Sequence, residues 1–227
     1  MTILIATGLR REARLMAGPG VTVIAGGGDA ARLERALDAL AGSASAILSS
    51  GLAGALDPTL KVGDIVIGNA APLPRREEGG GVQQMLERSI PEARVGPIVG
   101  SDHALATARE KAALFAETGA LAVDMESHIA ARVAARHGLP FVALRVISDA
   151  ADATLPPAAL AGMRSDGGIA IGSILASLMR NPAQLPALIR TGRDAEKAFR
   201  GLGRVHDVLR RFGVGGLDPG KLALDMG

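Results

Sequence analysis

Four carboxylates mark the two ends of one segment, Val123 to Asp152 (VDMESHIAARVAARHGLPFVALRVISDAAD). The pattern predicts an acidic entry, a helix, a turn and a buried strand. Two of the acids precede the helix and two follow the strand: Asp124, Glu126, Asp149 and Asp152. No lysine stands next to any of them in the sequence. Carboxylates at element ends are suited to acid–base work, so the rest of the chain should build a pocket around this segment.

Inside the segment, the periodicity of apolar residues changes from helical to extended. Ile129 and Val133 define one apolar helical face, and Gly138 stands where a C-terminal capping glycine belongs. Phe141 to Ile147 is apolar except for Arg145. A run of this kind is typical of a central strand that is covered on both faces.

The start of the chain predicts a second unit of the same kind. Thr2 to Ala6 is a β-branched, apolar run that indicates a buried strand, and Gly8 to Met16 is helical in pattern. Glu12 falls in that helix near the carboxyl end of the strand, the edge where open α/β sheets bind ligands. Taken alone, Glu12 fits a solvated helical position better than a functional one.

A glycine cluster follows the next predicted strand, Val21 to Ala25, and precedes a helix from Asp29 to Leu40. Gly26 to Gly28 gives a partial dinucleotide fingerprint, which requires an acid at the end of the following strand. That strand ends in Ser49-Ser50-Gly51 instead. A nicotinamide or flavin site is therefore rejected, and the glycines are assigned to a tight turn.

The third predicted strand, Ala46 to Ser50, leads into Gly51 and Gly54. Glycines after a strand let backbone amides approach an anion or a sugar, so both are candidate substrate-binding residues. Asp64 to Gly68 predicts a return strand, and the Gly/Pro-rich stretch from Ala70 to Gly81 predicts a surface loop.

Val95 to Gly100 predicts a further strand, after which Ser101-Asp102 is expected to cap a helix from His103 to Phe115. Strands alternate with helices throughout. We therefore expect an α/β fold, a three-layer αβα single domain over residues 1–227, with a helical C-terminal section from about residue 168.

The C-terminal section carries a helical apolar stripe with arginine and lysine opposite. The stripe comprises Ala195, Ala198, Leu202, Val205, Leu209 and Phe212. The basic face comprises Arg193, Lys197, Arg200, Arg204 and Arg211. A basic amphipathic helix can lie on an anionic membrane. Packing of the stripe on the domain, with a solvated outer face, is the favoured interpretation.

Composition narrows the function classes. Hydrophobic residues make up 48% of the 227, enough for a core. The net charge of +2 is too small to indicate a nucleic-acid partner, and none is expected. Cysteine is absent, which excludes thiol catalysis, and the four histidines show no metal-like pairing. No stretch predicts a signal peptide or a membrane span, so we expect a cytoplasmic protein.

Three separated segments share one resemblance. The Val123–Asp152 segment resembles the signature of the purine nucleoside phosphorylase and methylthioadenosine/adenosylhomocysteine nucleosidase superfamily. SGLAGALDPTLKVGDIVIG is similar to that family's ribose and nucleophile segment, and Glu12 matches the carboxylate that activates water in the nucleosidases. The Arg-rich C-terminal part is similar to the hopanoid-associated branch, which removes adenine from adenosylhopane. The resemblance implies a mixed central sheet.

The resemblance also implies a role for each site residue. Asp149 would be the acid at N7 of the purine, kept protonated by a closed pocket. Glu126 would bind the ribose hydroxyls, with Met125 packed on the sugar, and Glu12 would take a proton from the attacking water. Ser148 would orient Asp149 or touch the base. Asp124 and Asp152 are interpreted as structural.

The chain departs from the family pattern at several positions. Ser49 and Leu52 stand where the phosphorylases carry an arginine and a serine that hold phosphate, which favours hydrolysis. The nucleosidases keep that serine as well, so Leu52 leaves open how the nucleophile is positioned. Arg10, Arg11 or Arg14 could contact phosphate from another direction. His103-Ala104-Leu105 replaces a stacking phenylalanine and suggests a wide, apolar pocket for a bulky 5′ group.

The leading hypothesis is an enzyme that cleaves the N-glycosidic bond of a 5′-substituted adenosine, plausibly adenosylhopane. Alternatives are a methylthioadenosine/adenosylhomocysteine nucleosidase, a purine nucleoside phosphorylase, and a nucleoside-binding relative without turnover. No cofactor or metal is expected, although phosphate is a candidate co-substrate. We expect a homodimer or higher homo-oligomer, and peripheral contact with the inner face of the membrane is an alternative role for the C-terminal helix.

Overall fold

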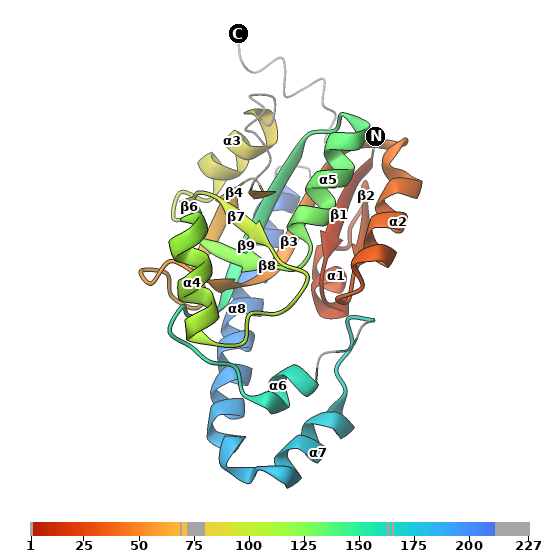
Figure 1. The fold of residues 1–227 in the computed structure, drawn as a ribbon. Helices are drawn as coiled ribbons and strands as arrows, with labels where there is room; N and C mark the ends of the chain where they lie inside the picture. The colour runs from red at the N-terminus through yellow and green to blue at the C-terminus, as the bar shows by residue number, and fades with distance from the viewer. Residues whose placement is uncertain (1, 69, 72–79, 163, 165, 212–227) are drawn as a thin grey trace.

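A mixed sheet of nine strands forms the centre of the computed structural model, which describes residues 2–68, 70–71, 80–162, 164 and 166–211 (Figure 1). The strands run in the order β5-β7-β8-β3-β9-β4-β6, and β1 pairs with both β2 and β3. Their bounds are β1 Thr2–Thr7, β2 Val21–Ala25, β3 Ala44–Ala55, β4 Ile65–Gly68, β5 Ala70–Ala71, β6 Arg94–Val95, β7 Ile98–Gly100, β8 Ala122–Asp124 and β9 Phe141–Asp149.

Helices cover both faces of the sheet, which confirms the three-layer α/β prediction (Figure 1). Helices α1, α3 and α8 pack on one face, and α2 and α5 pack on the other. The helical bounds are α1 Arg10–Met16, α2 Ala30–Ala41, α3 Gly80–Ser89, α4 Ala108–Thr118, α5 Ser127–His137, α6 Pro157–Ala161, α7 Ile171–Arg180, the 3-10 helix η2 Pro182–Gln184, and α8 Leu185–Arg211.

Strand β1 shows why the sheet needs two covering layers. Ile3 and Ile5 point into the cluster beneath α1 and α8, whereas Leu4 and Ala6 point into the cluster beneath α2 and α5. All four are buried, since successive side chains of a strand alternate between its faces. A continuous apolar run is the sequence pattern that this arrangement requires.

Strand β3 is much longer than the prediction of a strand that ends at Ser50. It continues through Gly51 and Gly54 to Ala55, pairing in parallel with β9 from Ile47 to Gly54 and antiparallel with β8 at its end. The two glycines therefore lie inside a strand rather than in a loop after it. The prediction failed here because glycine usually interrupts strands, whereas in β3 the ladder to β9 holds the backbone extended.

Two boundaries differ from the sequence-based expectation. The helix expected from His103 to Phe115 begins at Ala108, where Thr107 Oγ1 accepts a hydrogen bond from the Glu110 amide at 3.2 Å and Glu110 accepts one from the Thr107 amide at 2.8 Å. Ser101 and Asp102 therefore do not cap it. The strand expected over Val95 to Gly100 is split into β6 and β7, which pair with different neighbours.

Helix α8 lies against β9, as the favoured interpretation of the C-terminal stripe predicts. The stripe residues Ala198, Leu202, Val205 and Leu209 are buried, whereas Phe212 lies outside the described residues. Gly201 permits this close approach, because a Cβ atom there would lie 2.9 Å from Cγ1 of Val146 in β9. No helix within the described ranges is long and apolar enough to cross a membrane.

The segment after α6 returns to the loop that joins β1 to α1. The Arg10 amide donates to the Gly167 carbonyl at 3.0 Å, and the Arg10 guanidinium pairs with Asp166 at 3.0 Å. Gly167 has a φ of 75°, and a Cβ atom there would lie 2.8 Å from the carbonyl oxygen of Gly8. We name this set of contacts the Gly167 junction.

Truncating the α8 stripe should destabilise the whole domain. Leu202→Ala removes a fully buried side chain and should lower the free energy of unfolding by about 3 kcal/mol. Leu175→Ala, at a helical leucine that is 55% exposed, is the matched control and should change it by less than about 0.5 kcal/mol. Urea unfolding followed by circular dichroism measures both, and equal losses would contradict the packing of α8.

Candidate functional site

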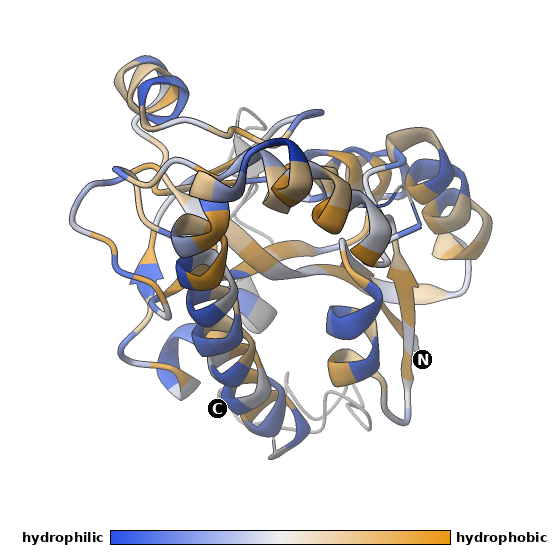
Figure 2. Cartoon of the chain, turned by 90° about the horizontal axis from the view of Figure 1, so that it is seen from below, coloured by the Kyte–Doolittle hydropathy of each residue, from blue (hydrophilic) through white to orange (hydrophobic). Residues whose placement is uncertain are grey.

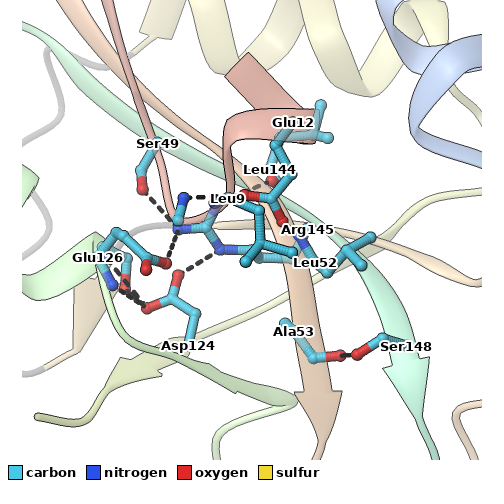
Figure 3. Close-up of polar contacts among 12 residues, drawn as sticks. Leu9, Glu12, Ser49, Leu52, Ala53, Asp124, Glu126, Leu144, Arg145 and Ser148 are labelled. Carbon is cyan, nitrogen blue, oxygen red and sulfur yellow. Dashed lines mark hydrogen bonds and ion pairs between the residues drawn. The ribbon is translucent and has the colours of Figure 1, made fainter. Parts of the chain in front are cut away.

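Glu12 is buried, in contrast to the solvated position that it suggests when taken alone. Its side chain folds back over the start of α1, where the amides of Gly8 and Leu9 donate to Oε2 at 2.8 and 2.7 Å. The Leu52 amide of β3 donates to Oε1 at 2.9 Å (Figure 3). Since a carboxylate offers about four acceptor sites, one remains on Oε1 for a water proton. Burial raises the pKa of Glu12, and the three amides and Arg145 partly oppose the shift.

Glycines make room for the three candidate acidic residues. A Cβ atom at Gly8 would lie 2.6 Å from Oε1 of Glu126, and one at Gly51 would lie 2.9 Å from the carboxylate of Glu12. A Cβ atom at Gly54 would lie 3.0 Å from Oδ2 of Asp149. Gly51 and Gly54 thus contact the acids themselves, whereas the sequence-based hypothesis assigned them to ligand-binding amides.

The same contacts show how the acids are arranged. Glu12 and Glu126 both border the position of a Gly8 side chain, so they face one space. Gly51 and Gly54, which border Glu12 and Asp149, lie three residues apart on β3, roughly 10 Å along the strand, and the pairing of β3 with β9 is irregular between Ala53 and Gly54. The fold thus brings Glu12 of α1 next to Glu126 at the start of α5, and it places Asp149 of β9 farther along β3.

A buried arginine joins the elements that carry these acids. Arg145 of β9 is completely buried, pairs with Asp124 of β8, and donates from Nη2 to Ser49 Oγ of β3 at 2.5 Å (Figure 3). Its Nη2 atom lies 3.9 Å from Oε2 of Glu126. Asp124 also accepts hydrogen bonds from the amide of Ser127 at 3.0 Å and from its hydroxyl at 2.6 Å. Asp124 thus caps α5 and neutralises Arg145.

Glu126 has the most strongly altered acidity of the site. Burial raises its pKa to about 8, and the neighbouring Asp124 and Glu12 carboxylates act in the same direction. Arg145 opposes the shift. Around neutral pH, Glu126 is therefore mostly protonated, and a protonated carboxyl can donate as well as accept a hydrogen bond.

Asp149 forms an ion pair that no sequence pattern revealed. The Lys111 side chain of α4 is fully buried and contacts Oδ2 of Asp149 through Nζ. Nζ also donates to the carbonyls of Ala150 at 2.9 Å and Ala153 at 3.1 Å, which uses all three ammonium hydrogens. The sequence-based hypothesis for Asp149 did not include this cation.

Ser148 and Met125 lie beside the acids, as the resemblance implies. Ser148 Oγ donates to Asp149 Oδ1 at 2.8 Å and also lies 3.2 Å from the Ala53 carbonyl oxygen. It thus orients Asp149, one of the two roles proposed for it. Met125 is half-buried, and its Cε atom lies 3.7 Å from a Cβ position at Gly28, in the turn after β2.

Arg10 and Arg11, which sequence reasoning offered as phosphate ligands, are engaged elsewhere. Arg10 takes part in the Gly167 junction, and Arg11 pairs with Glu196 at 2.7 Å and lies 4.0 Å above the Phe199 ring.

Among the described residues, no cluster of three or more His, Asp or Glu side chains could hold a metal. A cavity of about 330 Å³ borders Ala150, the residue after Asp149. Its lining residues are Pro58, Leu60, Lys61, Val62, Ala150 and Asp152.

One of the two site residues that sequence reasoning missed, Arg145, had a usable signal. Arg145 is the single charge in an otherwise apolar central strand, and a buried charge requires a partner. The acidic residues before α5 are the natural candidates. Lys111 offers no such signal, because its burial depends on where α4 begins, and that start was placed five residues too early.

Removing the acidity of Glu126 should change the pH dependence of stability. Its folded-state pKa is raised, so its favourable contribution is complete below about pH 4.5 and is lost as the pH rises through about 8. At pH 9, Glu126→Gln should therefore be more stable than the unmodified protein, on the order of 3 kcal/mol.

Urea unfolding at pH 6 and pH 9 measures this difference. Glu117→Gln, at an exposed glutamate of α4, is the matched control and should leave the pH dependence unchanged. Parallel pH profiles for Glu126→Gln and the unmodified protein would contradict the assignment.

Replacing Lys111 alone should lower the free energy of unfolding more than replacing both Lys111 and Asp149. Lys111→Met leaves Asp149 beside a site without its cation and should lower the free energy of unfolding by about 3 kcal/mol. Adding Asp149→Asn should recover part of that loss, since the double variant leaves no unpaired charge. A double-mutant cycle by urea unfolding gives the coupling energy, and a value near zero would show that the pair is not formed.

Comparisons with known proteins agree with the geometry. Residues 80–161 match the family model described as the phosphorylase superfamily. No curated protein sequence matches the chain.

Several solved structures share the fold. The methylthioadenosine/S-adenosylhomocysteine nucleosidase of Colwellia psychrerythraea, in complex with adenine, superposes with a TM-score of 0.58 at 18% identity, covering 78% of this chain and 96% of its own. The Helicobacter pylori nucleosidase gives 0.58 at 20% identity, covering 91% and 98%. The futalosine hydrolase of Helicobacter pylori gives 0.55 at 20% identity, covering 89% and 97%. Residues 80–161 thus resemble the phosphorylase superfamily in sequence, and the chain as a whole shares its fold with these nucleosidases and the hydrolase.

Proposed function

We propose that this protein is a nucleosidase that cleaves the N-glycosidic bond of a 5′-substituted adenosine and releases adenine. The observation that carries the proposal is the arrangement of Glu12, Glu126 and Asp149 around three glycines, Gly8 before α1 and Gly51 and Gly54 of β3. A binding protein has no need for two buried carboxyls and an ion-paired third one at a single site. The names of the structures that share the fold, nucleosidases and a hydrolase, support the same reaction class.

The nucleophile is proposed to be water, activated by Glu12. Glu12 accepts one proton of the water while the oxygen attacks C1′ and the bond from C1′ to N9 breaks. Three backbone amides fix the carboxylate, and the Leu52 amide is one of them. Leu52 stands where the nucleosidases carry a serine. Its main-chain amide contacts Glu12, so we propose that the amide helps to position the base without a side-chain hydroxyl.

The leaving adenine takes the bonding electrons on N9 and needs a proton on N7. The Lys111–Asp149 pair has two forms with the same number of protons, one with an ammonium and a carboxylate and one with a neutral amine and a carboxylic acid. When the nucleoside displaces water, the neutral form becomes easier to reach, and Asp149 can pass its proton to N7. Lys111 is then left neutral and regains a proton from solvent after adenine leaves. Glu126 hydrogen-bonds the ribose hydroxyls.

The 5′ substituent is proposed to be a large apolar group, with adenosylhopane as the leading candidate. The similarity of the Arg-rich C-terminal section to the hopanoid-associated branch supports this choice. Methylthioadenosine or S-adenosylhomocysteine is the second candidate, because nucleosidases acting on them share the fold. Phosphorolysis is less favoured, since Arg10 and Arg11 are held by acidic partners.

Incubation with adenosylhopane, methylthioadenosine and inosine, each with and without phosphate, tests the proposal. Free base and the sugar product are quantified by liquid chromatography with mass spectrometry. We expect adenine and an unphosphorylated sugar in the absence of phosphate. Product formation that requires phosphate would establish a phosphorylase instead, and binding of the nucleosides without base release would establish a binding protein.

Variants at the two ends of the site separate their roles. Glu12→Gln and Asp149→Asn should each reduce kcat for adenine release at least about 100-fold, because each removes a proton-transfer group. Asp152→Asn, at an exposed acid three residues after Asp149, is the matched control and should retain activity. Thermal unfolding confirms that each variant is folded, and a folded Glu12→Gln with normal hydrolysis would remove Glu12 from the mechanism.

A further inference from the structure

An apolar surface is exposed on α7 and the first turns of α8, away from the acids of the site. Ile171, Leu175 and Met179 follow one another at four-residue spacing along one side of α7 and are 67%, 55% and 85% exposed. Ile169 before α7 is 68% exposed, and Leu185 and Ile189 of α8 are 46% and 45% exposed. Large apolar side chains that gather in this way mark an interaction surface.

The two helices that carry this surface are basic. Arg180, Arg190 and Arg193 are exposed on them. Between Asp166 and Asp194 the sequence contains no aspartate or glutamate. We refer to the six apolar residues and these three arginines as the hairpin surface.

The two helices of the hairpin surface are held as one unit. Gln184 is buried between them, donates from Nε2 to the Ser177 carbonyl at 2.8 Å, and accepts from the Ala158 amide of α6 at 2.9 Å. Ile174 of α7 packs inward against Gly162, opposite the exposed side. Figure 1 shows the hairpin at the end of the molecule beyond the sheet, and Figure 2 views the molecule from that end, where apolar and hydrophilic residues lie together on the helices.

We propose that the hairpin surface binds the surface of an anionic lipid bilayer. Isoleucine, leucine and methionine side chains can enter the boundary between head groups and acyl chains, while arginines reach the phosphates. A second copy of this chain fits less well, because a symmetric contact would bring the arginines of the two copies together without acidic partners from the same segment. The inference does not depend on the proposed reaction, since it rests on exposure and charge alone.

The hairpin surface is a different part of the C-terminal section from the apolar stripe for which sequence analysis considered membrane contact. The stripe around Leu202 and Val205 is buried on the sheet and is closed to lipid. The exposed apolar residues instead precede it, in α7 and at the start of α8. Their side chains are already directed outward in the folded protein, so binding requires no helix to detach.

Flotation of the full chain with vesicles tests the proposal. Vesicles of phosphatidylcholine alone are compared with a 3:1 mixture of phosphatidylcholine and phosphatidylglycerol, at low and at high salt. We expect binding to the anionic vesicles at low salt and a large reduction at high salt. The Arg180→Gln, Arg190→Gln, Arg193→Gln triple variant should bind at least about tenfold more weakly, since each basic residue near an anionic surface adds to the attraction.

A second triple variant, Ile171→Ser, Leu175→Ser, Met179→Ser, tests the apolar part and should also lose at least about tenfold in binding. Arg35→Gln, Arg88→Gln, Arg109→Gln removes three exposed arginines elsewhere and is the charge-matched control, expected to stay within about twofold. Absence of binding to anionic vesicles at low salt would overturn the proposal. An equal loss of vesicle binding in the control variant would also overturn it. An oligomer that does not bind vesicles and that the serine variant converts to monomers would show instead that the surface joins two copies of the chain.

Discussion

The buried guanidinium of Arg145 is the interaction on which the site depends. It stands in the central strand β9 and satisfies its charge with Asp124 of β8, while a serine of β3 accepts a further hydrogen bond. Three strands and the start of α5 are thereby held in one relative position. A fully buried cation is costly unless its partners are in place, so the network strongly disfavours other registers of these strands. The position of Glu126 depends on this arrangement, and its pKa is raised by burial and, to a lesser extent, by the neighbouring Asp124 carboxylate.

The length of β3 determines the spacing of the chemistry. Because this strand continues through its glycines, Glu12 and Asp149 lie against positions three residues apart on one strand, whose pairing with β9 is irregular between Ala53 and Gly54. The two groups are held by different means: Glu12 by backbone amides and Asp149 by a lysine and a serine. Glu12 also shares its space with a second carboxyl, that of Glu126, whereas Asp149 lies against a cation.

Much of the fold and about half of the site could be predicted from the sequence. The periodicity of β1, β9, α2 and α5 was clear because each of these elements buries a face or both faces. The predicted boundaries were wrong where a glycine or a local helix cap determines them, at the end of β3 and at the start of α4. The acids Glu12, Glu126 and Asp149 were found because they follow strand ends or match a family pattern. Their partners Arg145 and Lys111 were not assigned, since pairing across a sheet depends on strand order, and β8 lies beside β3 rather than next to β9.

The Gly167 junction gives the helical C-terminal section a mechanical connection to the carboxylate of Glu12. The loop from Gly8 to Arg10 receives the backbone of Gly167 on one side and supplies two of the three amides that hold Glu12 on the other. A displacement of the segment before α7 would thus be transmitted through main-chain hydrogen bonds, without any side chain as intermediary. Events at the far helices can in this way tilt or steady the carboxylate of Glu12.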